Sequence, residues 1–303
     1  MRRPLCADLS RETAEPLAAT ASYIEHWILL EYRGLWPSAV LRESVLADPV
    51  KAHLRAQLAA LPRSRLLFIR RSERRKQGTY ALYFGRTSTT SHHFYGLEFD
   101  AYDELVELDL ACALLDDRDG AAGAPLEHPL LVVCTHGKRD RCCAKYGRLA
   151  YDAVRAEVEP HWVWQSTHVG GDRFAGNLVC FPEGLYFGRV ERADVAPLLD
   201  EYLEGRIYLE RYRGRSCYDF AVQAAERAVR GATGLTAIDG LALVSLEPDG
   251  AGWNVRLKAA GSGHVHELHV EVELGELTYL TCTSATLKRP RRFTAAERLL
   301  PGR

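Results

Sequence analysis

Three cysteines and one histidine lie on two polar segments, each of which follows a short apolar run. Cys134 ends the run Leu130–Val133, Cys142 and Cys143 come shortly after it, and His168 follows a second such run. Runs of this length are typical of buried strands, so we expect two strand ends to bring thiolate and imidazole to one pocket. These groups bind zinc, other transition metals and iron–sulfur clusters. The pattern therefore predicts a metal site.

Other roles for the cysteines stay open at this point. A buried cysteine without a metal behaves as a small apolar side chain, and zinc accepts cysteine and histidine ligands as readily as iron does. A disulfide between the adjacent Cys142 and Cys143 is disfavoured, because it forms a strained ring. The eight cysteines lack the dense spacing of a secreted disulfide scaffold, and three of them fall within residues 134–143, which favours metal or redox use.

Longer motifs surround these residues. Residues 134–143 read CTHGKRDRCC, which contains Cys-x-His-Gly-x-Arg-Asp-x-x-Cys, and residues 168–177 read HVGGDRFAGN. Both stretches resemble the sucrase/ferredoxin-like family of thioredoxin-like ferredoxins. Similar segments are found at 15–17, 19–21, 27–31, 185–190, 213–216 and 223–226, so the resemblance covers most of residues 1–230.

The resemblance implies a [2Fe–2S] cluster bound by two cysteines and two histidines. By motif position these ligands fall on Cys134, Cys143, His168 and position 172, but position 172 is Asp172 in this chain. Cys142 is the softer replacement for the missing histidine, whereas Asp172 holds the position itself. We favour Cys142, although neighbouring side chains of an extended segment point to opposite sides. Either ligand set should give a higher reduction potential than four cysteines.

Residues of the same motifs flank the expected ligands. Their side chains would support the cluster loop or donate hydrogen bonds near the sulfurs, and the glycines would let the backbone pass close to a bulky ligand. Ordinary loop capping is an equally good explanation for Asp140 and Asn177. The expected cofactor-binding residues are Arg139, Asp140, Gly170, Gly171, Arg173 and Asn177.

The apolar pattern predicts two similar units ahead of a smaller C-terminal part. The first has strands at 27–31, 66–69, 80–84 and 94–99, with a helix from Asp48 and another from Asp100. The second has strands at 130–133, 162–164, 178–181 and 185–190, with helices around Leu149 and at 195–202. Each unit reads β-α-β-β-β-α. The expected fold class is α/β, with two thioredoxin-like units, of which only the second keeps the ligands.

The C-terminal part should be a small α+β subdomain. A helix follows Ser216, and strands are expected at 241–246, 253–257, 265–272 and 277–282, separated by turn residues. His264 and His266 would share one face of a strand and His269 the other, which is typical of a solvated strand. The expected domains are 1–120, 121–212 and 213–303, with a linker at 117–129.

Composition limits the remaining choices. The chain has 303 residues, 47% of them hydrophobic, and a net charge of −1, which gives no reason to expect nucleic acid as a partner. No apolar stretch reaches the length of a membrane span and no leader pattern opens the chain, so we expect a cytoplasmic protein.

Three function classes remain. The first is an electron-transfer iron–sulfur protein, which would be a carrier with a separate redox partner protein rather than a stand-alone enzyme. The second is a thioredoxin-like thiol oxidoreductase, which is less favoured because no Cys-x-x-Cys is present. The third is a metal-stabilised binding module. A glycosidase is disfavoured, since no carboxylate pair is marked beside an aromatic cleft motif.

Overall fold

Two successive runs of strands and helices build one mixed sheet. The structure is a computed structural model that describes residues 3–71, 78–89, 92–115 and 123–297. The first run comprises α1 (Cys6–Glu12), β1 (His26–Glu31), α2 (Val40–Glu43), α3 (Asp48–Ala60), β2 (Ser64–Arg70), β3 (Tyr80–Thr87), β4 (His92–Phe99), the 3₁₀ helix η1 (Tyr102–Glu107) and α4 (Leu110–Leu115).

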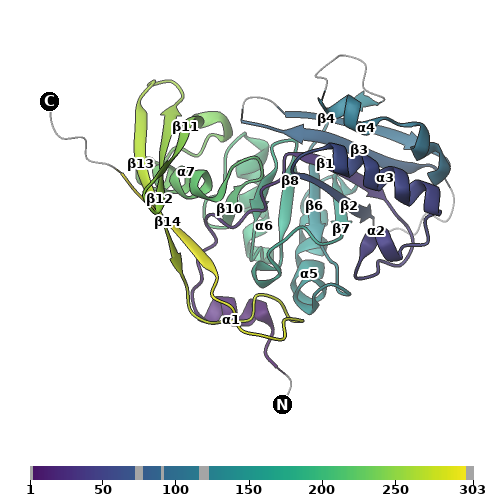
Figure 1. Ribbon diagram of the computed structural model, residues 1–303, viewed down its shortest axis with the longest axis horizontal. Coiled ribbons are helices and arrows are strands. Elements are labelled where there is room, and N and C mark those ends of the chain that lie inside the picture. Colours follow the sequence, from purple (N-terminus) through teal and green to yellow (C-terminus); the bar gives the residue numbers. More distant parts are fainter. Residues whose placement is uncertain (1–2, 72–77, 90–91, 116–122, 298–303) are drawn as a thin grey trace.

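The second run follows on the same sheet. It comprises β5 (Ala124–Pro125), β6 (Leu130–Cys134), α5 (Arg141–Glu157), η2 (Pro160–Trp162), β7 (Val163–Ser166), η3 (Asp172–Phe174), β8 (Leu178–Phe181), β9 (Leu185–Phe187), α6 (Arg192–Leu203) and β10 (Tyr212–Arg215). The ten strands lie in the order β10-β9-β8-β6-β7-β2-β1-β3-β4-β5 (Figure 1).

The two halves of this sheet repeat one arrangement. β1 pairs in parallel with β2 and antiparallel with β3, which pairs with β4. Likewise β6 pairs in parallel with β7 and antiparallel with β8, which pairs with β9. The β-α-β-β-β-α order expected for each unit is therefore present in both.

The halves meet where β2 and β7 run antiparallel. Ile69 pairs with Ser166 and Arg70 with Gln165. Thr167 extends the junction, because its N–H donates to the Phe68 carbonyl and its hydroxyl accepts from the Phe68 N–H at 3.0 Å. The sheet thus continues across the middle of the chain.

Strand β6 lies deep in the second half because all five of its side chains are apolar or thiol and buried. Leu131 and Val133 pack with α5 and α6 on one face. Val132 and Cys134 face the opposite core, which also contains Cys143. Because side chains alternate between the two faces of a strand, Cys134 lies on the same face of the sheet as Cys143.

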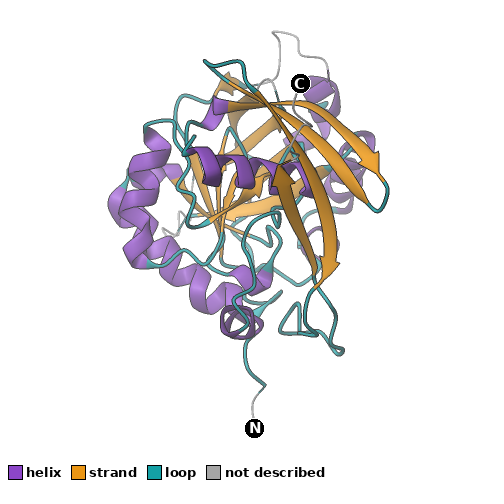
Figure 2. Ribbon diagram, turned by 90° about the vertical axis from the view of Figure 1, so that its left-hand side faces the viewer, coloured by secondary structure: helices purple, strands orange, loops and turns teal. Residues whose placement is uncertain are grey.

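The C-terminal part packs α7 (Phe220–Thr233) against a second, antiparallel sheet. After the 3₁₀ helix η4 (Ile238–Gly240), its strands are β11 (Leu241–Asp249), β12 (Gly252–Ala259), β13 (Val265–Leu274) and β14 (Arg291–Glu297), in that order. Figure 2 shows the molecule from the side of this sheet, whose long strands curve over α7. Alanines and valines of α7 form the buried side of the contact.

Several elements differ from those expected. Residues 277–282 form no strand; they lie in a long loop in which only Thr278 bridges to Lys288, and the fourth strand is β14. The helix expected from Asp100 is divided into η1 and α4. The boundary at 120/121 and part of the linker 117–129 lie outside the described residues, and the three-domain division stays a prediction.

Candidate metal centre

The end of β6 and the start of α5 hold the two cysteines of the motif. Cys134 is the last residue of β6. Asp140 caps α5, because its Oδ1 accepts a hydrogen bond of 2.8 Å from the Cys142 N–H. Cys143 therefore lies in the first turn of a long helix, where the helix dipole favours a thiolate.

The third motif residue arrives from the neighbouring strand. β7 is parallel to β6, and Cys134 pairs with Ser166, so the chain leaves both strands at the same edge. His168 follows two residues after the end of β7, and Gly170 and Gly171 then turn the chain with φ of 103° and 78°. This left-handed backbone is accessible to glycine at no steric cost. Asp172 opens the short helix η3 after the turn.

These elements bring the expected ligands together. The ligand atoms of Cys134, Cys143 and His168 all lie within 4.8 Å of one another. Asp172 Oδ1 lies 2.9 Å from His168 Nδ1 and 3.4 Å from Cys143 Sγ. We call Cys134, Cys143, His168 and Asp172 the motif group. It offers two thiols, one imidazole and one carboxylate.

The pKa values of the titratable groups in the motif group are shifted in different directions. A hydrogen bond from Cys143 lowers the pKa of Cys134 well below its usual value, although burial raises it. The same bond, together with burial, raises the pKa of Cys143. Burial lowers the pKa of His168, but Asp172 and Cys134 outweigh burial and raise it to about 9. Without a metal, the group thus favours a thiolate beside an imidazolium.

The motif group is closed on all sides but one. Cys134, Cys143 and Asp172 are 1%, 0% and 3% exposed. The His168 side chain is 26% exposed. An imidazole edge is therefore the part of the group that reaches solvent.

The donor set fits a metal-bound group. Although Asp172 is close, Nδ1 of His168 is buried and has no well-aligned hydrogen bond among the described residues, so the contact is one of charge. Once it has lost its proton, a nitrogen in this position is available as a ligand. Two thiols, an imidazole and a carboxylate give four donors, the number that binds a [2Fe–2S] cluster or a tetrahedral ion.

Cys142 does not join the motif group. Its Sγ lies 3.5 Å from Cys6 Sγ and 3.3 Å from Cys282 Sγ. Asp140 belongs to this second set as well. The reason is helical: consecutive residues of α5 point in different directions, so Cys143 faces β6 while Cys142 faces α1. Sequence spacing carried no signal for Cys6 or Cys282, which lie far from the motif.

Of the other expected residues, Arg173 and Asn177 support the loop beside the motif group. Arg139 is exposed. Arg173 pairs with Glu15 at 2.8 Å and so holds the N-terminal segment. Asn177 Nδ2 donates to the Gly171 carbonyl at 2.9 Å. A Cβ on Gly171 would lie 2.3 Å from Arg213, so the glycine leaves space for that arginine.

Arg213 is a positioning residue that the prediction left out of the site. It is 1% exposed and donates to the Gly170 carbonyl at 3.1 Å and to Asn177 Oδ1 at 2.8 Å. A further bond to Thr20 Oγ1 measures 3.0 Å. The guanidinium thereby fixes the turn between His168 and Asp172. The Arg-Gly-Arg-Ser segment of the resemblance was the available signal.

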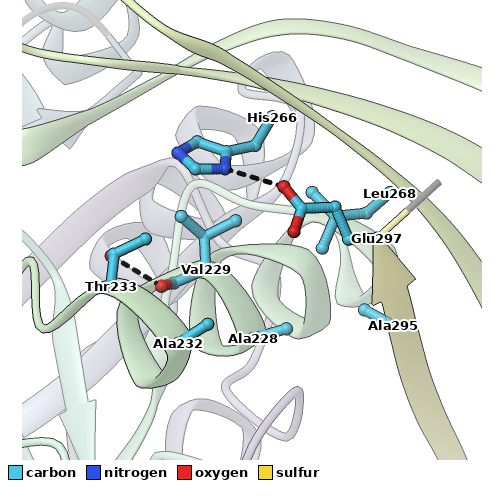
Figure 3. A pocket seen from close by; sticks show the side chains of 8 residues that line it. All are labelled: Ala228, Val229, Ala232, Thr233, His266, Leu268, Ala295 and Glu297. Carbon is cyan, nitrogen blue, oxygen red and sulfur yellow. Dashed lines mark hydrogen bonds and ion pairs between the residues drawn. The ribbon is translucent and has the colours of Figure 1, made fainter. Parts of the chain in front are cut away.

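A third group lies in the C-terminal part. His266 Nδ1 lies 3.1 Å from Glu297 Oε1, and its ring is 4.5 Å from that of His264. The pocket beside His266 is otherwise mostly apolar (Figure 3), with lining residues Ala228, Val229, Ala232, Thr233, His266, Leu268, Ala295 and Glu297. His264 and Glu297 are exposed, which is typical of a solvated strand edge.

No described helix is long and apolar enough to cross a membrane. Among curated proteins, "Altered inheritance of mitochondria protein 32" of Meyerozyma guilliermondii is 38% identical over 95 residues, covering 28% of this chain and 34% of that protein. The protein of the same name from Debaryomyces hansenii is 33% identical over 95 residues, covering 28% and 35%. The chain thus matches about a third of the length of these relatives.

Among solved structures, a cysteine-to-serine variant of the thioredoxin-like [2Fe-2S] ferredoxin from Aquifex aeolicus aligns with 19% identity and a TM-score of 0.24, over 28% of this chain and 96% of that one. The family model described as sucrase/ferredoxin-like matches residues 17–214, which contain the whole motif group. This match covers well over half of the chain, and it confirms the resemblance of the motifs. The chain belongs to the sucrase/ferredoxin-like family.

Proposed function

We propose that the chain is an electron-transfer protein that holds one [2Fe–2S] cluster through Cys134, Cys143, His168 and Asp172. The observation that carries this proposal is the convergence of the first three ligand atoms within 4.8 Å of one another, from two strand ends and a helix start. Membership of the sucrase/ferredoxin-like family supports iron and sulfide over zinc. The thioredoxin-like nature of each half belongs to the same proposal.

The ligand set suits a carrier with a raised potential. Replacing cysteine ligands by histidine raises the potential of a [2Fe–2S] cluster, because a neutral imidazole gives less negative charge to the iron. The bound group would supply one-electron chemistry. The chain itself excludes water from both thiolates and exposes only the edge of His168, where a separate reductase or acceptor protein would exchange electrons.

Thiol–disulfide exchange is less well supported. Attack on a disulfide needs an accessible thiolate, and Cys134 and Cys143 are almost fully buried. Hydrogen bonds from Cys143 and His168 lower the pKa of Cys134. A lowered pKa also suits a metal ligand, because a thiol must lose its proton to bind a metal. A thiolate prepared in this way is better placed to bind iron than to attack a partner.

Anaerobic purification followed by iron and sulfide analysis tests the proposal. We expect about two irons and two sulfides per chain, with visible charge-transfer absorption. Cys134→Ser and Cys143→Ser should lose most of both, because each removes a thiolate ligand. Cys180→Ser is the matched control, since Cys180 is equally buried on the neighbouring β8 and lies outside the group.

Two outcomes would contradict the proposal. One is a colourless wild-type protein that contains zinc but no sulfide after anaerobic purification. The other is iron content and absorption in both serine variants equal to those of the control.

A further inference from the structure

Three cysteines outside the motif group converge at one point. Sγ of Cys6 lies 3.5 Å from that of Cys142 and 3.7 Å from that of Cys282, and the last two sulfurs are 3.3 Å apart. Cys6 and Cys142 are 1% and 0% exposed, and Cys282 is half-buried. Three thiols from distant parts of the chain thus form a compact triangle.

Each thiol comes from a different segment. Cys6 begins α1, Cys142 lies in the first turn of α5, and Cys282 lies on the long loop between β13 and β14. Figure 1 shows this loop, in yellow, descending to α1 and away from the rest of the C-terminal sheet. Arg3 holds the loop in place by donating to the Ser284 carbonyl at 2.6 Å. The N-terminal segment and the loop between β13 and β14 therefore meet on one helix of the family domain.

The triangle matches the ligands of a single ion. Zinc–sulfur bonds of about 2.3 Å in a tetrahedral site place the sulfurs about 3.8 Å apart. The three sulfur–sulfur separations here, 3.3–3.7 Å, are close to this value. In cubane clusters each thiolate binds a different iron, which separates the sulfurs further. The geometry thus points to a mononuclear site.

Asp140 supplies the fourth donor. Its carboxylate oxygens lie 3.9 and 3.8 Å from Cys6 Sγ. Oδ1 accepts from the Cys142 N–H at 2.8 Å, and Oδ2 accepts from the Cys282 N–H at 2.6 Å. Each oxygen keeps a second lone pair for a metal. The Asp140 carboxylate therefore fixes the backbone at Cys142 and at Cys282, two of the three cysteines.

A backbone donor also points at a sulfur. The Ala7 N–H lies 3.4 Å from Cys142 Sγ and donates to it. Hydrogen bonds to sulfur stabilise bound thiolates. Together with the start of α5, this donor favours negative charge on Cys142.

We infer that Cys6, Cys142 and Cys282, with Asp140, bind one structural zinc ion. Binding is a ligand exchange without electron transfer: hydrated zinc releases its water ligands and three thiols lose their protons to solvent as three zinc–sulfur bonds and one bond to Asp140 form. The ion joins the N-terminal segment and the C-terminal loop to α5, although Cys6 and Cys282 lie outside the family match at 17–214. The zinc site is independent of the proposed cluster, because Cys142 and Cys143 face different groups.

Metal analysis of the full chain, purified anaerobically without chelator, tests this inference. We expect about one zinc per chain in addition to cluster iron. Cys6→Ser and Cys282→Ser should each lose most of the zinc while iron and visible absorption stay unchanged, because neither residue belongs to the motif group. Cys112→Ser, at an exposed cysteine outside both groups, should keep both metals.

A second measurement uses wild-type protein, so it does not depend on the folding of a variant. Removal of zinc by a chelator and addition of Co²⁺ should give the strong ligand-field and thiolate charge-transfer absorption of a tetrahedral cobalt site. Wild-type protein with no zinc and no cobalt spectrum would overturn the inference. So would a disulfide between any two of the three cysteines in freshly isolated protein, or zinc retained by both serine variants.

Discussion

Asp172 lies against both His168 and Cys143, whereas Cys142 lies against Cys6 and Cys282. The geometry therefore favours Asp172 as the fourth ligand of the motif group, although it is the harder donor. We expect Asp172→Ala to lose most of the iron and Cys142→Ala to retain it. Iron analysis and visible absorption check this. The reverse pattern would show that the loop turns Cys142 toward the cluster when iron binds.

Arg213 is the second test at this scale. Replacement by Met keeps much of the volume but removes the bonds to the Gly170 carbonyl and to Asn177. We expect a loss of about 2–4 kcal/mol in the free energy of unfolding, and faster loss of iron during anaerobic dialysis. Arg256→Met, at a half-exposed ion pair with Glu267, is the control and should change neither. Equal iron loss in both variants would refute the positioning role.

Local signals could predict one group of cysteines but not the other. Cys134, Cys143 and His168 follow strand ends with motif spacing, so the sequence indicated their meeting. Cys6 and Cys282 reach Cys142 only because the N-terminal segment and the loop between β13 and β14 fold back on α5. No periodicity encodes such a return, which depends on tertiary packing.

Helix caps can be tested at the scale of the element. Asp219 caps α7, since its Oδ1 accepts a hydrogen bond of 3.0 Å from the Ala221 N–H. Asp219→Ala should lower the free energy of unfolding by about 1 kcal/mol, whereas Asp219→Asn should be close to wild type. Thermal or chemical unfolding monitored by circular dichroism checks this. Equal losses in both variants would mean that the charge, not the cap, is important.

Most elements were predictable where the apolar pattern is strong. β1 and β6 are continuous buried runs, and α5 has a clear apolar face. β10 reads Tyr-Arg-Gly-Arg, and its two arginines are buried by partners elsewhere in the fold, so composition concealed it. The apolar residues at 277–282 indicated a strand, but that segment holds Cys282 against α5 instead.

The pH dependence of stability belongs to the whole molecule. Burial raises the pKa of Glu183, although the Tyr202 hydroxyl, at 2.7 Å, opposes this. A carboxyl whose folded-state pKa is raised binds its proton more tightly in the native state, so its contribution to stability falls as pH rises through that range.

We therefore expect Glu183→Gln to raise the melting temperature near neutral pH and to have little effect below the unfolded pKa of about 4.3. Melting curves of both proteins across pH check this. Glu204→Gln, which alters an exposed carboxylate, serves as the control. An identical pH profile for Glu183→Gln and wild type would show that Glu183 ionises normally.

The repeated strand order was predictable from two similar successions of apolar runs. The way in which the halves join was not, because two register pairs between β2 and β7 leave no trace in composition. The routes of the N-terminal segment and of the loop that carries Cys282 were equally hidden.

The antiparallel junction between β2 and β7 also affects the tendency of the protein to self-associate. Each half protects the strand edge of the other, as two subunits of a symmetric dimer would, but within one chain. An unprotected edge is a template for pairing with further copies. Either half expressed alone would present one more such edge, that of β2 or β7, and we expect it to self-associate more strongly with increasing concentration than the intact chain.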